Sequence, residues 1–438
     1  MKLLIMDLDD HVGNGLDLAL RAKEHNHEVT YWSEKPHLCG TGMVDRITGD
    51  GWKRSLEGAD LTVLTENCEY PKGLELCFEQ AYPIFGTNPK AAELELDREK
   101  GQQTLERYGI ETLPFEIVNA PAEAIAAVVK ANKPFVMKPW GGAEDKSTTC
   151  VARTPDEAIW TLNRWKEQGK FPEQLMLQEK VEGEEIGVSA FFGPGGWSKP
   201  IEESWEYKKF LNDDLGQNTG EMGTVIRHVS KSKLFDLLLE PLTDYLHLCR
   251  YVGDCSVNCI VDKKGNAWPL EFTMRLGWPD FLIRHEVIQG DPVEWMRDLV
   301  YGKDTLEVRT DIVCGVEMVH GDFPWKKDPE GLWSGFPLSG ITSSNYDRLH
   351  FKQAMDGKYK KIQGGRVVQV DGTLTAGTCP LVVTGSGRTV TAARDEAYAV
   401  VGAVKWPSNV MYRTDIGNDL EESLPLLQKH GYAMGAKF

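Results

Sequence analysis

The sequence lacks the features of membrane-spanning, secreted and nucleic-acid-binding proteins. Its 438 residues contain no apolar run of membrane-spanning length, and the start, MKLLIMDLDD, has none of the charged, apolar and cleavage regions of a signal peptide. Positive charge is scarce: 49 Lys and Arg stand against 66 Asp and Glu, a formal net charge of -17. Because Lys and Arg contacts dominate binding to nucleic acids and anionic membranes, we expect neither partner. We expect a cytoplasmic protein.

A disulfide framework and a zinc site are also disfavoured. The nine cysteines are scattered and include no Cys-x-x-Cys pair, which is typical of reduced thiols. Cys255 and Cys259 share one face of a predicted strand and Cys249 precedes them, so a metal site is conceivable. No ligand set with zinc-finger spacing accompanies them, and buried small side chains are the better interpretation.

A dinucleotide fingerprint is missing from the first loop, DLDDHVGNGLD. The loop has Gly13 and Gly15 but not the third glycine of Gly-x-Gly-x-x-Gly. It also holds several carboxylates that would repel phosphate, namely Asp7, Asp9, Asp10 and Asp17. A nicotinamide-dependent dehydrogenase, which an alternating β/α start would otherwise suggest, is therefore disfavoured.

The chain is too long for one hydrophobic core, and we expect roughly three units. Residues 1–100 predict a small doubly wound parallel sheet, residues 101–310 a central unit with a lid-sized module at about 119–182, and residues 311–438 a β-rich unit. The expected strands are 3–6, 28–32, 61–64, 83–85, 115–118, 135–138, 149–152 and 175–179. The expected helices are 15–24, 73–80, 122–131, 155–168, 292–300 and 393–404, with one charged helix from Ala91 to near Gly109.

Residues Val257–Arg275 predict a hairpin around the turn Lys-Lys-Gly-Asn. Two-residue alternation places Glu271, Thr273 and Arg275 on one face, and Asn258 on the paired strand faces the same site. Magnesium prefers oxygen ligands and is usually held by one or two carboxylates plus nucleotide phosphates. Glu271 is the only carboxylate on that face. Taken alone, the segment fits a solvated hairpin with an incidental glutamate equally well.

Three further segments carry polar residues that suit a nucleotide. In FVMKPWGGAEDKSTT, Lys138 ends a strand and Lys146 follows two glycines, an arrangement that can cradle phosphate or form an ordinary surface hairpin. In LMLQEKVEGEE, the backbone of residues 179–181 could meet an adenine edge and Glu185 a ribose, although a strand with a charged exit has the same pattern. The polar loop that follows Lys208 is too long for a turn, and such loops are usually functional.

In this order and spacing, the segments resemble the phosphoribosylamine-glycine ligase family of ATP-grasp enzymes. The matching stretches are FGTNPKAAELE, RYGIETLP, QEKVEGEE, DLGQNTGEMG, LEFTMRLGWPD, AGT, VVTGSGR, AARDEAYAVV and YRTDIG. The resemblance implies an α/β ATP-grasp fold with an N-terminal doubly wound parallel-sheet domain and a C-terminal β-rich domain.

The resemblance also implies roles for residues at matching positions. ATP would be bound by Arg98, Lys138, Lys146, Lys208, the hinge residues Gln178, Glu179 and Val181, and the ribose-binding Glu185. The substrates would contact Asp214, Asn218, Thr219 and Arg388. Mg2+ or Mn2+ would be held by Glu271 and Asn258, and Arg275 and Lys146 would act on the transferred phosphate.

The implied reaction joins glycine to phosphoribosylamine through an acyl phosphate, with small molecules as partners and a monomer or small homo-oligomer as the assembly. Several acceptor-side residues depart from the family pattern: the first loop is acidic, Glu221 replaces a glycine, Thr273 replaces an asparagine, and Trp278, Pro279 and Asp280 replace an Asp-Pro-Glu run. A ligase for a different amine or amino acid, or a nucleotide-binding homologue without ligase activity, therefore stays open.

Overall fold

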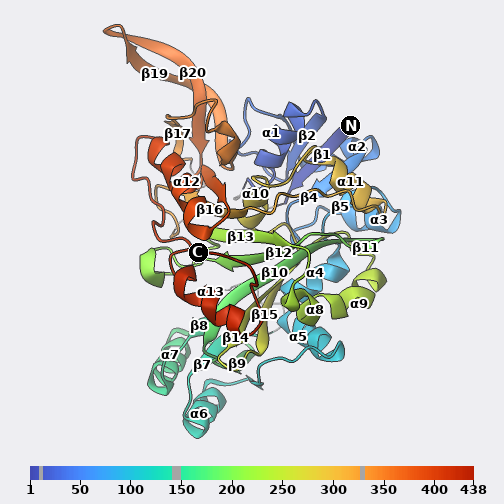
Figure 1. Cartoon of the computed structure of the whole chain (residues 1–438), viewed down its shortest axis with the longest axis vertical. Helices are drawn as coiled ribbons and strands as arrows, with labels where there is room; N and C mark the ends of the chain where they lie inside the picture. Colours follow the sequence, from blue (N-terminus) through green and yellow to red (C-terminus); the bar gives the residue numbers. More distant parts are fainter. Residues whose placement is uncertain (9–12, 141–148, 326–330) are drawn as a thin grey trace.

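The computed structural model describes residues 1–8, 13–140, 149–325 and 331–438 (Figure 1). Lys146, predicted in the phosphate loop, lies outside the described residues. Within the described ranges, no helix is long and apolar enough to cross a membrane. All nine cysteines are free thiols.

The N-terminal sheet is parallel, with the strand order β3-β2-β1-β4-β5. Alternate residues of its first strand enter two cores: Leu3 and Ile5 belong to one hydrophobic cluster, whereas Leu4 and Met6 belong to another. Burial on both faces is the expected doubly wound arrangement. The elements are β1 (Lys2–Asp7), α1 (Leu16–Glu24), β2 (Glu28–Ser33), β3 (Asp45–Thr48), α2 (Trp52–Glu57), β4 (Leu61–Leu64), α3 (Leu74–Glu79) and β5 (Ile84–Phe85).

Two of these elements, β3 and α2, are absent from the sequence-based expectation. The sequence of β3, DRIT, carries a single large apolar residue and no buried position, so it gives no clear strand signal.

The single charged helix predicted from Ala91 to near Gly109 is wrong, because the chain forms two helices there. These are α4 (Pro89–Leu96) and α5 (Arg98–Arg107). Asp97 breaks the run with extended backbone angles, and its side chain accepts hydrogen bonds from the backbone N–H groups of Glu99 and Lys100. An aspartate in this role satisfies otherwise unpaired donors at a helix start, which favours a new helix over continuation of the old one.

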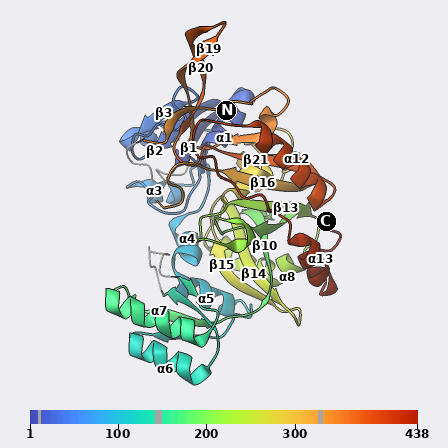
Figure 2. The ribbon, with the colours of Figure 1, turned by 90° about the vertical axis from the view of Figure 1, so that its left-hand side faces the viewer.

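The lid-sized module is a four-stranded antiparallel sheet, ordered β6-β9-β7-β8, on which two helices pack side by side (Figures 1 and 2). Its small core includes Val118, Val128, Leu162 and Leu177. The elements are β6 (Phe115–Val118), α6 (Pro121–Ala131), β7 (Phe135–Pro139), β8 (Cys150–Val151), α7 (Pro155–Gln168) and β9 (Leu175–Glu179).

The central sheet has nine strands and runs β15-β14-β10-β12-β13-β16-β21-β18, with β11 attached to β10. The strands are β10 (Gly183–Gly193), β11 (Gly196–Trp197), β12 (Ile201–Glu206), β13 (Gly223–Val229), β14 (Gly253–Asp262), β15 (Ala267–Thr273), β16 (Ile312–Met318), β18 (Leu349–Phe351) and β21 (Leu381–Gly387). Residues on both sides of position 311 thus share one sheet. The division of the chain into three domains stays a prediction.

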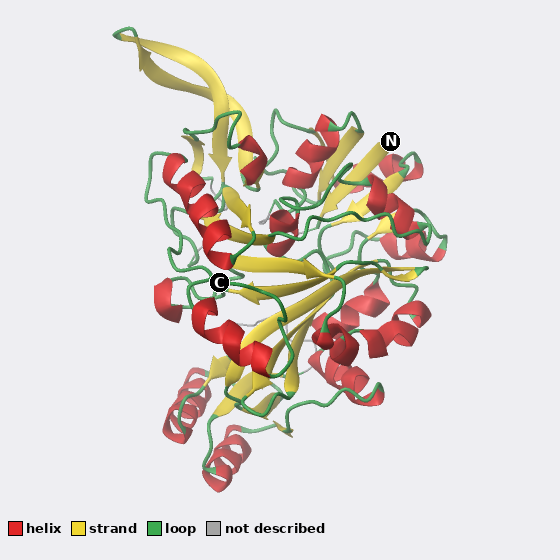
Figure 3. Cartoon of the chain, in the orientation of Figure 1, coloured by secondary structure: helices red, strands yellow, loops and turns green. Residues whose placement is uncertain are grey.

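The remaining helices flank this sheet (Figure 3). They are α8 (Lys233–Leu238), α9 (Thr243–Leu248), α10 (Asp280–Arg284), α11 (Glu294–Val300), α12 (Val390–Ala403) and α13 (Leu420–Lys429). A long two-stranded ribbon, β19 (Ala354–Gln363) with β20 (Arg366–Ala376), projects from the body, and β17 (Ser334–Pro337) pairs with its base (Figure 1).

Candidate active site

A lysine surrounded by carboxylates lies where four strands of the central sheet meet. The Nζ of Lys208 is 3.0 Å from Glu206, 3.0 Å from Glu271 and 3.6 Å from Glu185. The side-chain amide of Asn258 donates to Glu185 at 2.6 Å and to Glu206 at 3.3 Å. These residues come from β10, β12, β14 and β15 and from the segment after β12, so the sheet order itself assembles the group.

The hairpin register explains why Asn258 joins this cluster. Asn258 pairs directly with Glu271, and a bulge follows at the next position. Directly opposed residues of an antiparallel pair point to the same face. The Oδ1 of Asn258 is buried and has no hydrogen-bond partner among the described residues, so it is an oxygen donor open to a cation.

The charges of the cluster act strongly on one another. Burial would lower the pKa of Lys208, but Glu206, Glu271 and Glu185 outweigh it and hold that pKa well above its usual value. Burial raises the pKa of Glu206, and Lys208 opposes the rise. The lysine is therefore charged at neutral pH and balances part of the surrounding negative charge.

Two more cations face the same group from α5 and the lid. Burial lowers the pKa of Lys138, with Glu271 acting against it and Arg98 and Lys208 adding to it. Burial likewise lowers the pKa of Arg98, again opposed by Glu271. Arg98 is held in place by a 2.8 Å hydrogen bond to the carbonyl of Pro139, at the end of the strand that carries Lys138. Cations so close together suit a polyanionic ligand.

The sequence reasoning missed Glu206 and took Glu271 as a lone carboxylate. Glu206 ends β12, close to Lys208 in the chain, whereas Glu185 lies on β10 and reaches the cluster through the pairing of β10 with β12. A local signal existed for Glu206, because it lies two residues before Lys208 at a strand end. Nothing local linked either residue to Glu271.

The alternation predicted for the hairpin does not extend to Arg275. Strand β15 ends at Thr273, and the chain then turns toward α4. There the Nε of Arg275 lies 3.1 Å from Glu95 and 3.3 Å from Glu66. Burial would lower the pKa of Arg275, but Glu66 and Glu95 outweigh it and raise the pKa. Arg275 thus ties the end of the hairpin to α4, and its role in phosphate transfer stays a prediction.

The predicted adenine hinge lies between β9 and β10. Gln178 is buried in the lid sheet and Val181 is half-buried in the connecting segment, while Glu179 forms an ion pair with Lys133. The backbone N–H of Glu179 already donates to the carbonyl of Pro114. Adenine binding by this hinge therefore stays a prediction, and the segment after β9 is the part that would contact the adenine.

The predicted substrate residues fall into two groups. Thr219 lies against the cluster, because its backbone N–H and its hydroxyl both donate to the carbonyl of Lys208, at 2.8 and 2.9 Å. Asn218 forms an antiparallel β-bridge with Lys209. Asp214 instead pairs with Arg413 at 2.8 Å.

Arg413 is only 2% exposed and holds the loop around Asp214 through this ion pair. The sequence did not predict this role, although Arg413 belongs to the matching stretch YRTDIG. Arg388 is exposed at the end of β21.

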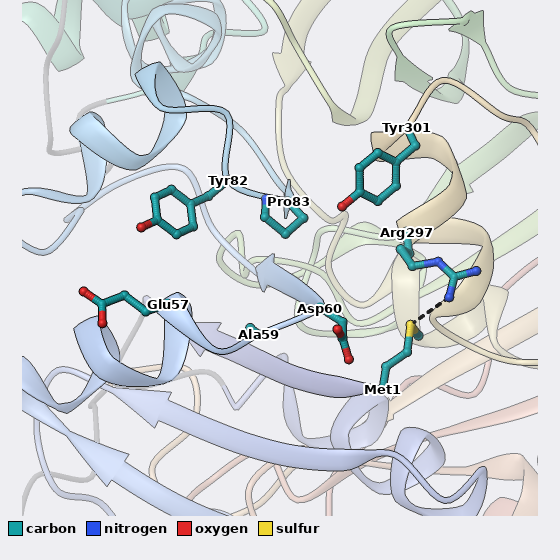
Figure 4. A pocket seen from close by; sticks show the side chains of 8 residues that line it. All are labelled: Met1, Glu57, Ala59, Asp60, Tyr82, Pro83, Arg297 and Tyr301. Carbon is teal, nitrogen blue, oxygen red and sulfur yellow. Dashed lines mark hydrogen bonds between the residues drawn. The ribbon is translucent and has the colours of Figure 1, made fainter.

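A pocket of about 640 Å³ opens at the other end of the N-terminal sheet (Figure 4). Its lining residues are Met1, Glu57, Ala59, Asp60, Tyr82, Pro83, Arg297 and Tyr301. Met1, Asp60 and Pro83 precede β1, β4 and β5, so the pocket lies at the amino ends of parallel strands. Ligands of open parallel sheets bind at the carboxyl ends, and we assign no role in the reaction to this pocket.

The comparisons with known proteins cover the segments that carry the cluster. Residues 98–280, which include Arg98, Lys208 and Glu271, match the family model described as phosphoribosylglycinamide synthetase, ATP-grasp (A) domain. A phosphoribosylamine-glycine ligase of Xylella fastidiosa is 25% identical over 374 residues, which cover 82% of each chain.

Two solved structures share the fold. A phosphoribosylamine-glycine ligase of Thermotoga maritima gives a TM-score of 0.70 at 20% identity, covering 94% of this chain and 100% of that one. The N5-carboxyaminoimidazole synthetase of Staphylococcus aureus, solved with ADP, gives 0.58 at 13% identity, covering 92% of this chain and 97% of that one. Residues 98–280 therefore match an ATP-grasp domain of phosphoribosylglycinamide synthetase, and the chain is similar over most of its length to phosphoribosylamine-glycine ligases.

Proposed function

We propose that the protein is an ATP-dependent carboxylate-amine ligase that forms an amide through an acyl phosphate. The observation that carries the proposal is the joint presence of Arg98, Lys138 and Lys208 around Glu271 and Asn258. Three cations beside a group of oxygen donors suit a nucleotide triphosphate and its metal ion. The names of the relatives make glycine and phosphoribosylamine the leading substrates.

The chemistry explains why such a site is needed. A carboxylate is a poor electrophile and hydroxide a poor leaving group, so direct condensation with an amine is slow. Phosphorylation of the carboxylate supplies a good leaving group, and the amine then displaces phosphate. The protein's part is to neutralise and align the phosphates, which Lys138 and Arg98 are placed to do. Lys146 is a further candidate in this role.

The donor set fits a magnesium ion. Glu271, Glu206 and the open Oδ1 of Asn258 are hard oxygen donors, and Mg2+ usually binds through one or two carboxylates together with nucleotide phosphates. When bound, the ion would supply positive charge to the transferred phosphate. Manganese would fit the same donors.

Other parts of the proposal rest on the relatives and on composition. We propose ribose binding by Glu185 and substrate contacts by Thr219 and Asn218. A cytoplasmic location, small-molecule substrates and a monomer or small homo-oligomer complete the proposal.

The direct test measures amide formation and ADP together. Purified protein with ATP, Mg2+, glycine and fresh phosphoribosylamine should release ADP and phosphate in proportion to the amide formed. A parallel reaction replaces the amine with hydroxylamine, which traps an acyl phosphate as a hydroxamate. Hydroxamate without amide would keep the ligase class and redirect the search to another amine. ATP binding by calorimetry without hydroxamate or ADP from any pair would favour a nucleotide-binding homologue and refute the proposal.

A further inference from the structure

One buried carboxylate near the cluster has no hydrogen-bond or ion-pair partner among the described residues. Glu221 is 9% exposed, and its Oε1 is fully buried without a hydrogen bond to any described residue. No ion pair of the described residues involves Glu221. Burial raises the pKa of Glu221 well above its usual value, with the negative charges of Glu206 and Asp280 adding to the effect and Lys208 opposing it. Buried carboxylates in proteins are normally paired, so this one stands out.

The backbone places Glu221 beside the reaction site. The N–H of Met222 donates to the carbonyl of Tyr207 at 2.8 Å, and its carbonyl accepts from the N–H of Glu317 at 3.0 Å. Residue 221 is therefore fixed between the segment that carries Lys208 on one side and β16 on the other. Residue 221 lies two positions before β13, whose Thr224 pairs with Glu206 on β12.

The neighbouring cations are already committed to other carboxylates. Lys208 is shared by Glu185, Glu206 and Glu271. Lys352 pairs with Glu317 at 2.8 Å and lies over the ring of Trp278. The guanidinium of Arg284 is surrounded by Glu202, Asp254 and Asp280. Within the described residues, none of these three cations forms an ion pair with Glu221.

We propose that Glu221 binds the ammonium group of a substrate. An ammonium ion offers the positive charge and the N–H donors that a buried carboxylate lacks. The inference rests on the proposed ligase function and deepens it, because both substrates of such a ligase can carry this group. The amino acid carries it as its α-amino group, and the acceptor carries it as its amine, which must give up its proton to Glu221 or to solvent before it attacks. Glu221 thus selects a protonated amine, whichever substrate supplies it.

A purely structural glutamate predicts different behaviour. A carboxylate that stabilised the fold would form internal hydrogen bonds, and its loss would destabilise the protein. Replacement of an unpaired buried carboxylate by the neutral, equally shaped glutamine should leave stability unchanged or raise it, while binding suffers. Stability and substrate affinity should therefore change independently in Glu221→Gln.

The experiment compares wild type, Glu221→Gln and Glu57→Gln, an exposed carboxylate on α2 that serves as the control. Hydroxamate formation is measured against glycine concentration with hydroxylamine as the nucleophile. Glycolate, which replaces the ammonium of glycine by a hydroxyl, is the uncharged analogue. If glycine supplies the ammonium, Glu221→Gln should raise the KM for glycine by about 10-fold or more and reduce the preference for glycine over glycolate.

The second arm of the experiment tests whether the acceptor supplies the ammonium group that Glu221 binds. Amide formation is measured against phosphoribosylamine, and then against simple primary amines, at saturating glycine. A raised KM for the amine with an unchanged KM for glycine assigns Glu221 to the acceptor. Unchanged KM values for both substrates, together with an unchanged preference for glycine over glycolate, would refute the inference.

A binding measurement keeps the inference testable if wild type forms no hydroxamate, an outcome that counts against the proposed ligase function alone. The melting temperature is then recorded with ATP and Mg2+ and with glycine, glycolate or methylamine. Stabilisation by an ammonium compound that Glu221→Gln loses and Glu57→Gln retains supports the inference. Equal stabilisation of all three proteins, or none, refutes it.

Discussion

Replacement of Lys208 by methionine tests whether charge holds the cluster together. Methionine keeps an unbranched stem of similar length but removes the ammonium group that Glu206, Glu271 and Glu185 share. The three carboxylates would then face one another without this cation. We expect Lys208→Met to lower the free energy of unfolding and to make the protein unusually responsive to divalent cations.

The geometry sets the size of the effect. Two unit charges 3.0 Å apart attract by about 5.5 kcal/mol at an effective dielectric constant of about 20. Removal of one partner from a fully buried pair costs about 3–5 kcal/mol, whereas exposed pairs contribute about 0–1 kcal/mol. The side chain of Lys208 is 32% exposed, that of Glu206 18% and that of Glu271 45%. An intermediate loss of about 2 kcal/mol follows for Lys208→Met.

Magnesium should restore much of this loss. With Lys208 gone, the oxygens of Glu206, Glu271 and Glu185 and the open Oδ1 of Asn258 form a more negative site. A cation that binds only the folded state raises the free energy of unfolding by RT ln(1 + [L]/Kd), where [L] is the free cation concentration and Kd its dissociation constant. Millimolar Mg2+ should therefore stabilise Lys208→Met more than wild type in urea denaturation.

The matched control is Lys263→Met. Lys263 also forms an ion pair, with Glu182 at 2.8 Å, but both side chains are largely exposed. We expect no measurable change in stability and no altered response to Mg2+ in this variant. Wild-type stability in Lys208→Met would show that charge balance does not hold the cluster. Lost stability without a magnesium response would refute a cation site built from these carboxylates.

Three further outcomes are expected. Glu271→Gln should abolish Mg2+-dependent ADP release, and an unchanged rate would remove the hairpin from the mechanism. Arg413→Met should free the loop around Asp214 and speed its cleavage in limited proteolysis, whereas wild-type cleavage rates would show that the ion pair is dispensable. Burial lowers the pKa of His285 to about 4. Between about pH 4 and 6.5 the unfolded chain therefore binds more protons than the folded protein. The free energy of unfolding should fall as the pH falls through this window. The loss reaches about 3 kcal/mol, measured by urea denaturation, and His285→Gln should flatten the profile.

Features set by local sequence were predictable. The N-terminal β/α alternation, the lid elements and the hairpin turn follow from short apolar runs bounded by turn residues, and the structure has them within a few positions. The pairing of Asn258 with Glu271 does not follow from the turn alone, because the register at the turn would pair Asn258 with Leu270 and a bulge between Asn258 and Cys259 shifts it by one residue. Asp97 was misread because a run of good helix formers on both sides masked its capping role.

Features set by pairing between distant segments were not predictable. Gly223 pairs with Val316, so β13 and β16 join across the boundary expected at residue 311. Glu185 and Glu271 reach Lys208 for the same reason, because the strand order rather than the chain order brings them together. The ion pair between Asp214 and Arg413 likewise joins two stretches that were each recognised alone.

The charged groups on the two sides of the site along the central sheet are opposite in sign. On the β15 side, Glu271 is within the influence of two lid-side cations, Lys138 and Arg98, which suits phosphates. Across Lys208, the β13 side offers Glu221, a carboxylate with no ion pair in the part of the chain that the structure describes, which suits an ammonium group.

If the amino acid supplies the ammonium that Glu221 is proposed to bind, its two charged groups would span these two sides, with its carboxylate toward Lys138 and Arg98. The reversed orientation would set the carboxylate against Glu221 and the ammonium against Lys138, so that like charges would face each other at both ends. For an amino-acid substrate we therefore expect the charge pattern to favour the orientation in which its carboxylate meets ATP.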